Sequence, residues 1–323
     1  MKPILEVSHL TKTFYTSSNN LFDIHRKKIT AVDDVSFSVF PGTTLGIVGE
    51  TGCGKSTLGR TIIRLYEPTS GEISFEGQPI AKMCENEFRP LRKKIQMIFQ
   101  DPYLSLDARM TAGEIIAEPI KIHKILSSQK SIVEKECEIM EMVGLNKEHL
   151  NRYPHEFSGG QRQRIGLARA LAVGAKLIIC DEPVSALDVS IQAQIITLFE
   201  DLQSKLNLTY LFISHDLAMV KHISDTVAVM YLGKFVEMAS KNELFENPYH
   251  PYTKLLISAV PVPDPKLEKN RYKYFNFQEL IQENQYNNLC KFYDRCEIKS
   301  KICKNGTPML REVSSGHWVS CFV

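Results

Sequence analysis

Residues 44–57 read TLGIVGETGCGKST, an apolar run followed directly by a glycine-rich loop. The apolar residues 44–48 predict a short buried strand, and apolar side chains at helical spacing after Lys55 predict a helix. The loop between them fits the pattern G-x-x-x-x-G-K-[ST], in which backbone N–H groups surround phosphate oxygens. The helix adds the positive end of its dipole at the same place. This stretch therefore predicts a nucleoside triphosphate site.

The loop and the first residues after it are the predicted contacts of the nucleotide, taken to be ATP. Lys55 supplies a positive charge for the β- and γ-phosphates, and Ser56 offers its hydroxyl to Mg²⁺. A glycine-rich turn without a ligand is the alternative, but the strand–loop–helix order favours phosphate binding. The full predicted set is Gly49, Glu50, Thr51, Gly52, Cys53, Gly54, Lys55, Ser56 and Thr57.

Two carboxylates follow a second apolar run, residues 177–180. The carboxyl end of a parallel strand faces the ligand crevice of an open α/β sheet. Asp181 is therefore predicted to bind Mg²⁺, and Glu182 to act as the general base that polarises the attacking water. A solvated acidic turn before Pro183 is the alternative, which the phosphate loop in the same chain makes less favourable.

Composition limits the remaining classes. The chain has 323 residues, a formal net charge of +2, 43% hydrophobic and 24% charged residues. This charge is too weakly basic to favour a nucleic-acid partner. No apolar stretch approaches the roughly 18 residues of a membrane span, and the N-terminus lacks the apolar core of a signal peptide. Any membrane span is therefore expected from a partner.

The order of the predicted elements favours a right-handed parallel α/β sheet, because strands alternate with helices. Polar residues 16–30 predict a surface insertion, and residues 111–150 predict a helical region. Composition changes near residue 246, and residues 264–323 predict an appended tail with its own small organisation. The expected strands are 4–8, 31–39, 44–48, 95–99, 177–180 and 210–213, with a helix over 191–206.

Residues 157–164, FSGGQRQR, resemble the signature motif of ABC-type ATPases, with Phe157 where many members have leucine. A polar helix N-cap at Ser158 is the plain alternative, although a free helix N-terminus is also suited to a γ-phosphate. The family's other motifs follow the same order along residues 4–245. They are Gln100, the loop 185–188, His215 and an early aromatic residue, Phe14, with Tyr15 as the alternative.

The resemblance implies a role for each matched residue. Gln100 would sense the γ-phosphate, Mg²⁺ and water, His215 would contact the γ-phosphate, and Phe14 would stack on adenine. The catalytic set would be Glu182, His215 and Gln100, and the magnesium set Ser56, Gln100 and Asp181. Residues acting across a dimer seam would be Ser158, Gly159, Gly160, Gln161 and Asp188.

The implied fold is α/β, an ABC-type ATPase. It has a RecA-like parallel sheet core, an antiparallel β subdomain, a helical signature subdomain at about 101–172, and a small C-terminal tail. The ATPase domain would cover 1–245 and the tail 246–323.

Longer stretches resemble the ATPase subunits of oligopeptide, dipeptide and nickel importers. They are QDPYLSL at 100–106, EPVSALDVSIQ at 182–192, and HPYT at 250–253 with AVPVPDP at 259–265. The resemblance implies an ATP hydrolase that energises import of peptides or related small solutes. Two ATPase domains would close head to tail on ATP and reopen after hydrolysis.

The implied partners are a second, different ATPase chain, two transmembrane permease subunits and an extracytoplasmic solute-binding protein, with no nucleic acid. The chain would lie peripherally on the cytoplasmic face of the plasma or inner membrane. A nickel or metal-chelate importer and a soluble ABC ATPase without transport remain alternatives. A small-molecule kinase would share the phosphate loop but would not explain residues 158–161.

Four of the eight cysteines fall in the tail, at Cys290, Cys296, Cys303 and Cys321. Four thiolates can hold a [4Fe–4S] cluster or zinc, yet the spacing C-x5-C-x6-C-x17-C matches neither the short zinc pairs nor the ferredoxin pattern. Some family members bind a [4Fe–4S] cluster in a similar tail. Cluster, zinc and unligated thiols all remain open.

Overall fold

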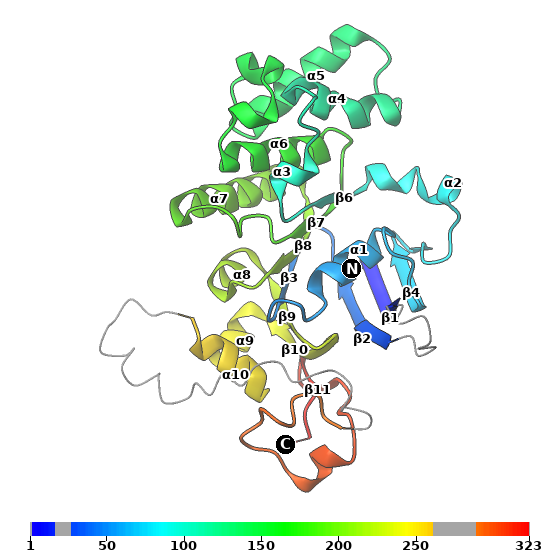
Figure 1. Cartoon of the computed structure of the whole chain (residues 1–323), viewed down its shortest axis with the longest axis vertical. Helices are drawn as coiled ribbons and strands as arrows, with labels where there is room; N and C mark the ends of the chain where they lie inside the picture. The colour runs from blue at the N-terminus through cyan, green and yellow to red at the C-terminus, as the bar shows by residue number, and fades with distance from the viewer. Residues whose placement is uncertain (1, 17–26, 261–288, 323) are drawn as a thin grey trace.

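The computed structural model describes residues 2–16, 27–260 and 289–322 (Figure 1). The molecule is elongated: a helical region lies at one end, the sheets lie in the middle, and the C-terminal segment lies at the other end. None of the described helices is long and apolar enough to cross a membrane.

The central sheet carries the parallel strands expected from the sequence. Its order is β11-β12-β10-β9-β3-β8-β7-β6. The strands that follow one another in parallel are β9 (Thr226–Tyr231), β3 (Thr44–Val48), β8 (Thr209–Ser214), β7 (Leu177–Asp181) and β6 (Ile95–Ile98). Every residue of β3, β7 and β8 is buried. Their unbroken apolar runs are typical of strands covered on both faces.

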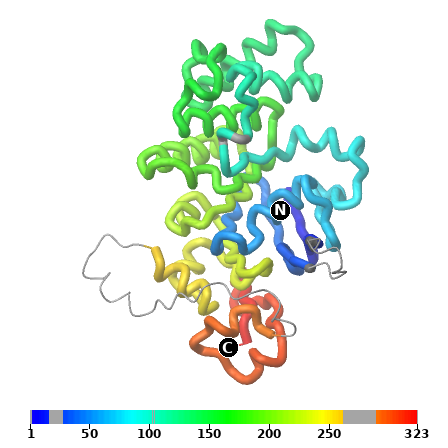
Figure 2. Tube along the Cα trace, in the orientation of Figure 1, coloured from blue at the N-terminus to red at the C-terminus, as the bar shows by residue number. Residues whose placement is uncertain are grey.

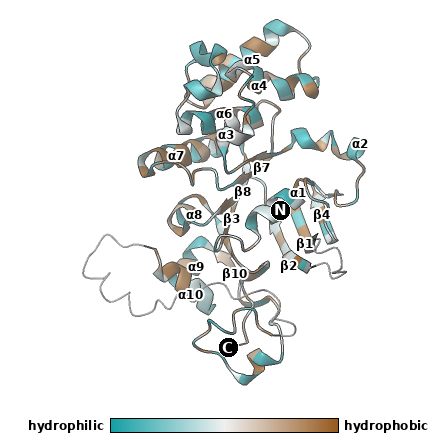
Figure 3. Ribbon diagram, viewed as in Figure 1, coloured by the Kyte–Doolittle hydropathy of each residue, from teal (hydrophilic) through white to brown (hydrophobic). Residues whose placement is uncertain are grey.

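The two faces of this sheet belong to different cores. Ile178 and Cys180 of β7 pack with the helices, whereas Leu177 and Ile179 pack in the core that includes α1 (Lys55–Ile62) and the second sheet. This alternation follows from the twofold side-chain period of a strand. In Figure 3 the central strands are coloured mainly brown, for hydrophobic residues, and the peripheral helix α2 (Glu85–Phe88) mainly teal.

The second sheet is antiparallel, with the order β2-β1-β4-β5. Its strands are β1 (Leu5–Thr16), β2 (Lys27–Val39), β4 (Ser70–Phe75) and β5 (Gln78–Pro79). The predicted surface insertion over 16–30 is wrong at its ends, because Thr16 pairs with Lys27 and Tyr15 with Lys28. Polar side chains suit the solvent-exposed face of the paired ends of β1 and β2. Composition alone therefore did not distinguish these strand ends from a loop. Residues 17–26 lie outside the described residues.

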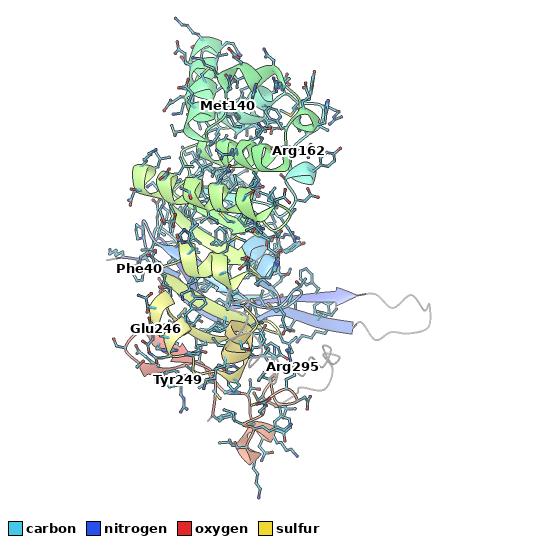
Figure 4. The ribbon with its side chains drawn as sticks, turned by 90° about the vertical axis from the view of Figure 1, so that its left-hand side faces the viewer. Phe40, Met140, Arg162, Glu246, Tyr249 and Arg295 are labelled. Atoms are coloured by element: carbon cyan, nitrogen blue, oxygen red, sulfur yellow. The ribbon has the colours of Figure 1, made fainter. Side chains whose placement is uncertain are left out.

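The helical region predicted over 111–150 is confirmed and continues to residue 171. Its helices are α4 (Ala112–Ile122), α5 (Gln129–Met142) and α6 (Gly159–Leu171), preceded by α3 (Pro102–Ser105). Side chains of Thr111, Ser128 and Ser158 cap these three helices by accepting a backbone N–H three residues on, which binds donors that a helix start leaves unpaired. Figure 4 labels Met140 and Arg162 in this region.

The remaining helices cover the central sheet and lead to its antiparallel edge. They are α7 (Val189–Leu206), α8 (Leu217–Ile223), α9 (Lys241–Glu246) and α10 (Pro251–Ser258). Short 3₁₀ helices lie at Leu91–Lys93, Lys147–Asn151, Pro154–Glu156 and Lys301–Lys304. The helix expected over 191–206 is α7.

The sequence predicted a tail with its own small organisation. In the structure the C-terminal segment is instead joined to the central sheet. Strand β12 (His317–Val319) pairs with β10 (Lys234–Ser240), and β11 (Arg311–Ser314) pairs with β12, so the tail extends the central sheet. In Figure 2 the red C-terminal trace rises to meet the segment that contains β10. Strand pairing between residues some 80 positions apart leaves no periodic signal in either segment.

A buried carboxylate holds this junction. Glu237 of β10 is 0% exposed and accepts hydrogen bonds from the backbone N–H groups of Tyr249 at 2.7 Å and His250 at 2.9 Å. The Nε2 atom of His317 on β12, also 0% exposed, lies 2.7 Å from the same carboxylate and donates to it. Glu237 therefore connects β10, α10 and the C-terminal hairpin.

We predict that Glu237→Ala lowers the free energy of unfolding by about 3 kcal/mol, because it leaves buried donors without an acceptor. Urea denaturation followed by circular dichroism measures the change. The exposed residue Glu246, labelled in Figure 4, supplies the control: Glu246→Ala should stay within about 0.5 kcal/mol of the parent chain. Equal urea midpoints for the two variants would contradict the assigned role of Glu237.

Candidate nucleotide site

The glycine-rich loop joins β3 to α1, as expected. Gly54 has φ of 110°, and a Cβ atom there would lie 2.0 Å from the carbonyl oxygen of Ala31 on β2. Only glycine fits a position with both a left-handed backbone and so close a neighbour. The loop is therefore pressed against the antiparallel sheet, and its shape depends on that contact.

Lys55 lies within this loop, where 4% of the residue is exposed. Its Nζ atom donates to the carbonyl oxygens of Gly49 at 2.7 Å and Glu50 at 3.0 Å. The ammonium group is thus enclosed by the loop that the sequence assigns to phosphate. Thr51 and Gly52 are exposed, Cys53 is buried, and the carbonyl of Thr57 accepts the hydroxyl of Thr61 within α1.

Ser56 and Asp181 meet at the predicted magnesium position. The Ser56 hydroxyl donates to Oδ1 of Asp181 at 2.6 Å, and a guanidinium nitrogen of Arg60 lies 3.5 Å from Oδ2. Burial raises the pKa of Asp181, and the hydrogen bond from Ser56 and the charge of Arg60 only partly oppose this. Within the described part of the chain, the buried Oδ2 accepts no hydrogen bond. The Ser56 hydroxyl and the Asp181 carboxylate, whose Oδ2 atom is buried without a hydrogen bond, fit an oxygen-binding cation such as Mg²⁺.

Two of the predicted catalytic residues, Gln100 and His215, converge on one oxygen atom of the third, Glu182. Gln100, just after β6, donates from Nε2 to Oε2 of Glu182 at 2.9 Å. The Nδ1 atom of His215, just after β8, lies 3.1 Å from the same Oε2. Glu182 itself follows β7, is 7% exposed, and has a left-handed backbone with φ of 48°. Non-glycine residues in that region cost about 1–3 kcal/mol and cluster at functional sites.

The signature segment begins α6. The Ser158 hydroxyl accepts from the backbone N–H of Gln161 at 3.3 Å, and the Gln161 side chain accepts from the Ser158 N–H at 2.9 Å. Phe157 is buried and packs its ring against His149, which accounts for a large apolar residue at this position.

The signature glycines pack against the loop that follows Glu182. A Cβ atom on Gly159 would lie 2.9 Å from Leu187, and one on Gly160 would lie 2.5 Å from Ile191 of α7. Asp188 directly precedes α7, is exposed and makes no side-chain cap, and the following Val189 is 81% exposed. The start of α6 and the loop 185–188 thus lie together on one chain.

Comparison with known proteins gives a consistent family. Residues 32–185 match the family model for the ABC transporter, and residues 236–303 match the model for the oligopeptide/dipeptide transporter C-terminal region. The chain is 52% identical over 320 residues to the oligopeptide transport ATP-binding protein OppF of Bacillus subtilis, covering 98% of this chain and 96% of the relative. It is 49% identical to OppF of Escherichia coli K12, covering 99% and 96%.

The chain belongs to the ABC transporter ATP-binding proteins of the oligopeptide type.

Solved structures agree with this assignment. One is a dimeric ATP-binding cassette in a post-hydrolysis state with ADP and Pi, which matches with a TM-score of 0.65 and 26% sequence identity. The match covers 73% of this chain and 98% of that cassette. CbiO1 of Clostridium perfringens, part of an ABC transporter complex, has a TM-score of 0.66 and 25% identity, and covers 76% and 92%. The predicted fold and the assignment as an ATPase coupled to transport are confirmed.

The two early aromatic residues of this ABC ATPase lie in different environments. The Phe14 ring meets Tyr66 edge to face at 5.3 Å between centroids, with the Lys12 ammonium 5.0 Å from its centre. Tyr15 is 60% exposed. The predicted stacking of Phe14 on adenine stays a prediction, with Tyr15 as its alternative.

The four cysteines of the tail are free thiols. Burial, together with the smaller effect of the charges of Cys303, Cys296 and Cys321, raises the pKa of Cys290 to about 11. Their chemistry suits a soft metal. Nevertheless, residues 2–16, 27–260 and 289–322 contain no group of three His, Cys, Asp or Glu side chains arranged to hold a metal ion. The arrangement gives no support to a cluster or a zinc ion over unligated thiols.

Sequence reasoning missed three residues at the site. Arg60 follows Ser56 by four positions, a helical spacing that could have indicated a shared face. Tyr252 and Arg295 both bind Glu50, across 202 and 245 residues. No local pattern connects residues so far apart in sequence.

We predict that Gly160→Ala lowers the free energy of unfolding by about 1–3 kcal/mol, because the new methyl group must displace Ile191. Gly166 supplies a matched control in the same helix, since a Cβ atom there would meet no atom within 4 Å. Gly166→Ala should leave stability unchanged or raise it by up to about 1 kcal/mol. Urea denaturation of both variants is the measurement, and equal midpoints would contradict the packing argument.

Proposed function

We propose that this ABC ATPase hydrolyses ATP at the site formed by the glycine-rich loop, Asp181 and Glu182, and thereby energises import of peptides. The observation that carries the proposal is the convergence of Gln100 and His215 on Glu182, beside the Ser56–Asp181 pair. Gln100 and His215 hold the Glu182 carboxylate, which would orient the attacking water. Ser56 and Asp181 would provide oxygen ligands for the cation of the nucleotide.

The residues of this site divide the work of phosphoryl transfer. Residues 49–57 would bind the triphosphate, with Lys55 moving from loop carbonyls to the β- and γ-phosphates. Mg²⁺, held by Ser56, Asp181 and Gln100, would neutralise charge that develops on the phosphate oxygens. Glu182 would accept a hydrogen bond from the attacking water, because its Oε2 atom is fixed by neighbours on both sides.

The second half of the site would come from a partner ATPase domain. The N-terminus of α6 presents backbone N–H groups and the positive end of a helix dipole, which suit a γ-phosphate. We therefore assign Ser158, Gly159, Gly160 and Gln161, together with the exposed Asp188, to contacts across a head-to-tail dimer. Phe14 is assigned to adenine of the same nucleotide. Closure on ATP would exclude water, and hydrolysis would reopen the pair.

The relatives support the assignment of a substrate class and of partners. OppF proteins of two organisms are oligopeptide transport ATP-binding proteins, and the C-terminal match belongs to the same transporter group. We infer peptides as cargo, a second ATPase chain, two transmembrane permeases, an extracytoplasmic solute-binding protein, and a position on the cytoplasmic face of the membrane. We also retain 1–245 as the ATPase domain, with its helical subdomain at about 101–172, and 246–323 as the tail.

Transport assays separate the cargo classes. In vesicles containing the whole transporter, ATP-dependent accumulation of a labelled oligopeptide supports peptide import. Accumulation of nickel or a metal chelate, without peptide, would replace it with the metal-importer alternative. The soluble ABC ATPase remains only if neither accumulates and the chain purifies without membrane subunits.

The tail cysteines are given no step in this mechanism. Metal analysis of an anaerobically purified sample distinguishes the three alternatives from the sequence. Iron with brown absorbance in the visible range identifies an iron–sulfur cluster, zinc alone identifies a zinc site, and neither metal leaves unligated thiols.

We predict that Glu182→Gln binds ATP but lowers turnover at least about 100-fold, because an amide cannot accept the proton of the attacking water. ATP should then accumulate in a closed dimer, visible as a larger species by size-exclusion chromatography with ATP and Mg²⁺. Glu85→Gln, on the exposed helix α2, is the control and should retain parental turnover. Parental turnover in Glu182→Gln would remove Glu182 from this role.

A further inference from the structure

An acidic side chain occupies the loop that must bind a polyanion. Glu50 is the first residue after Gly49, and its carboxylate is 27% exposed. A carboxylate close to a triphosphate repels it, by an amount that grows as water is excluded. The loop therefore needs something that neutralises Glu50 and keeps its charge away from the ligand.

Arg295 of the C-terminal segment provides that neutralisation. Its two terminal nitrogens donate to the two carboxylate oxygens of Glu50, at 3.0 and 2.9 Å. A forked pair of this kind fixes orientation as well as charge. Figure 4 shows Arg295 where the C-terminal segment meets the strands above it.

Aromatic rings hold Arg295 in this position. The guanidinium carbon lies 5.7 Å from the ring centre of Tyr231, 5.9 Å from Tyr252 and 5.7 Å from Phe292. The Arg295 side chain is only 10% exposed. Cation–π contacts gain strength when water is excluded, so this enclosure favours one orientation of the guanidinium group.

The backbone of Glu50 is held from the same side. Its N–H donates to the hydroxyl of the fully buried Tyr252 at 2.9 Å, while its carbonyl accepts from Nζ of Lys55 at 3.0 Å. One residue thus connects the C-terminal part of the chain to the lysine that serves the phosphates. A substitution at Arg295 can therefore alter the affinity for the nucleotide through both the charge and the position of Glu50.

We propose that Arg295 is a positioning residue of the nucleotide site, which neutralises Glu50 and holds its side chain away from the bound triphosphate. The proposal rests on the assignment of residues 49–57 to ATP. It adds that the C-terminal segment, from outside the shared ATPase motifs, sets the affinity of this site.

The test measures the dissociation constant of Mg²⁺-ATP for the purified full chain by isothermal titration calorimetry. We expect Arg295→Gln to weaken binding about tenfold, because it leaves the Glu50 charge beside the triphosphate. Arg295→Lys keeps the charge without the fork and should weaken binding about threefold. Lys299→Gln makes the same change of charge in the same segment, where Lys299 lies over the Tyr293 ring, and should bind as the parent does.

A double variant separates neutralisation from a merely structural role. In Glu50→Gln/Arg295→Gln the repelling charge is gone, so affinity should return to within about twofold of the parent. Loss of affinity that persists in the double variant, or parental affinity in Arg295→Gln, would overturn the proposal. If Arg295→Gln does not fold, as judged by circular dichroism, Arg295→Lys and the double variant decide by the same criteria.

Lys55→Ala distinguishes failure of this inference from failure of the proposed site. If Lys55→Ala loses ATP while Arg295→Gln binds normally, the loop is the nucleotide site and Arg295 is not its positioning residue. If Lys55→Ala binds ATP as the parent does, the assignment of the site itself fails.

Discussion

A single oxygen, Oε2 of Glu182, joins the ends of three strands, because Gln100 after β6 and His215 after β8 both reach it. The parallel pairing of β6 with β7 and of β7 with β8 fixes the register of all three strand ends. A slip of one residue would move the side chain to the opposite face. The buried sheet therefore sets the geometry of the Glu182 carboxylate, and the left-handed backbone at Glu182 is maintained by that surrounding structure.

The same strand end is also connected to the signature segment. After Glu182 the chain passes through the loop 185–188 into α7, and the side chains of Leu187 and Ile191 lie so close to the signature glycines that a side chain there would have to displace them. The glycines consequently have a packing role within the chain in addition to the role assigned to them across a dimer. A shift in the loop after Glu182 would displace the start of α6, because close-packed side chains have little free space in which to move.

The sequence predicted those strands and motifs that are determined by residues close together in the chain. Continuous apolar runs predicted β3, β7 and β8, and the motifs placed Ser56 and Asp181 at one position, where the structure brings them together. Long-range pairings were missed: the antiparallel ribbon at Tyr15 and Lys28, the β10–β12 pairing, and the contact between Glu50 and Arg295. Each is decided by complementary hydrogen bonds or charges that meet only after folding. For the four tail cysteines the sequence left a cluster, zinc and unligated thiols open, and the described residues add no ligand geometry that selects a metal.

The C-terminal segment is bound to the ATPase through charges that the ATPase itself contributes. Glu237 lies buried under His317, Asp33 lies 2.9 Å from the Lys291 ammonium, and Glu50 is paired with Arg295. Removing such a segment would not simply expose apolar surface. It would leave a buried carboxylate with fewer partners and an uncompensated negative charge in the phosphate loop, and both changes are unfavourable. The ATPase part of this chain is therefore electrostatically complete only with its C-terminal segment in place, although every catalytic motif lies before it.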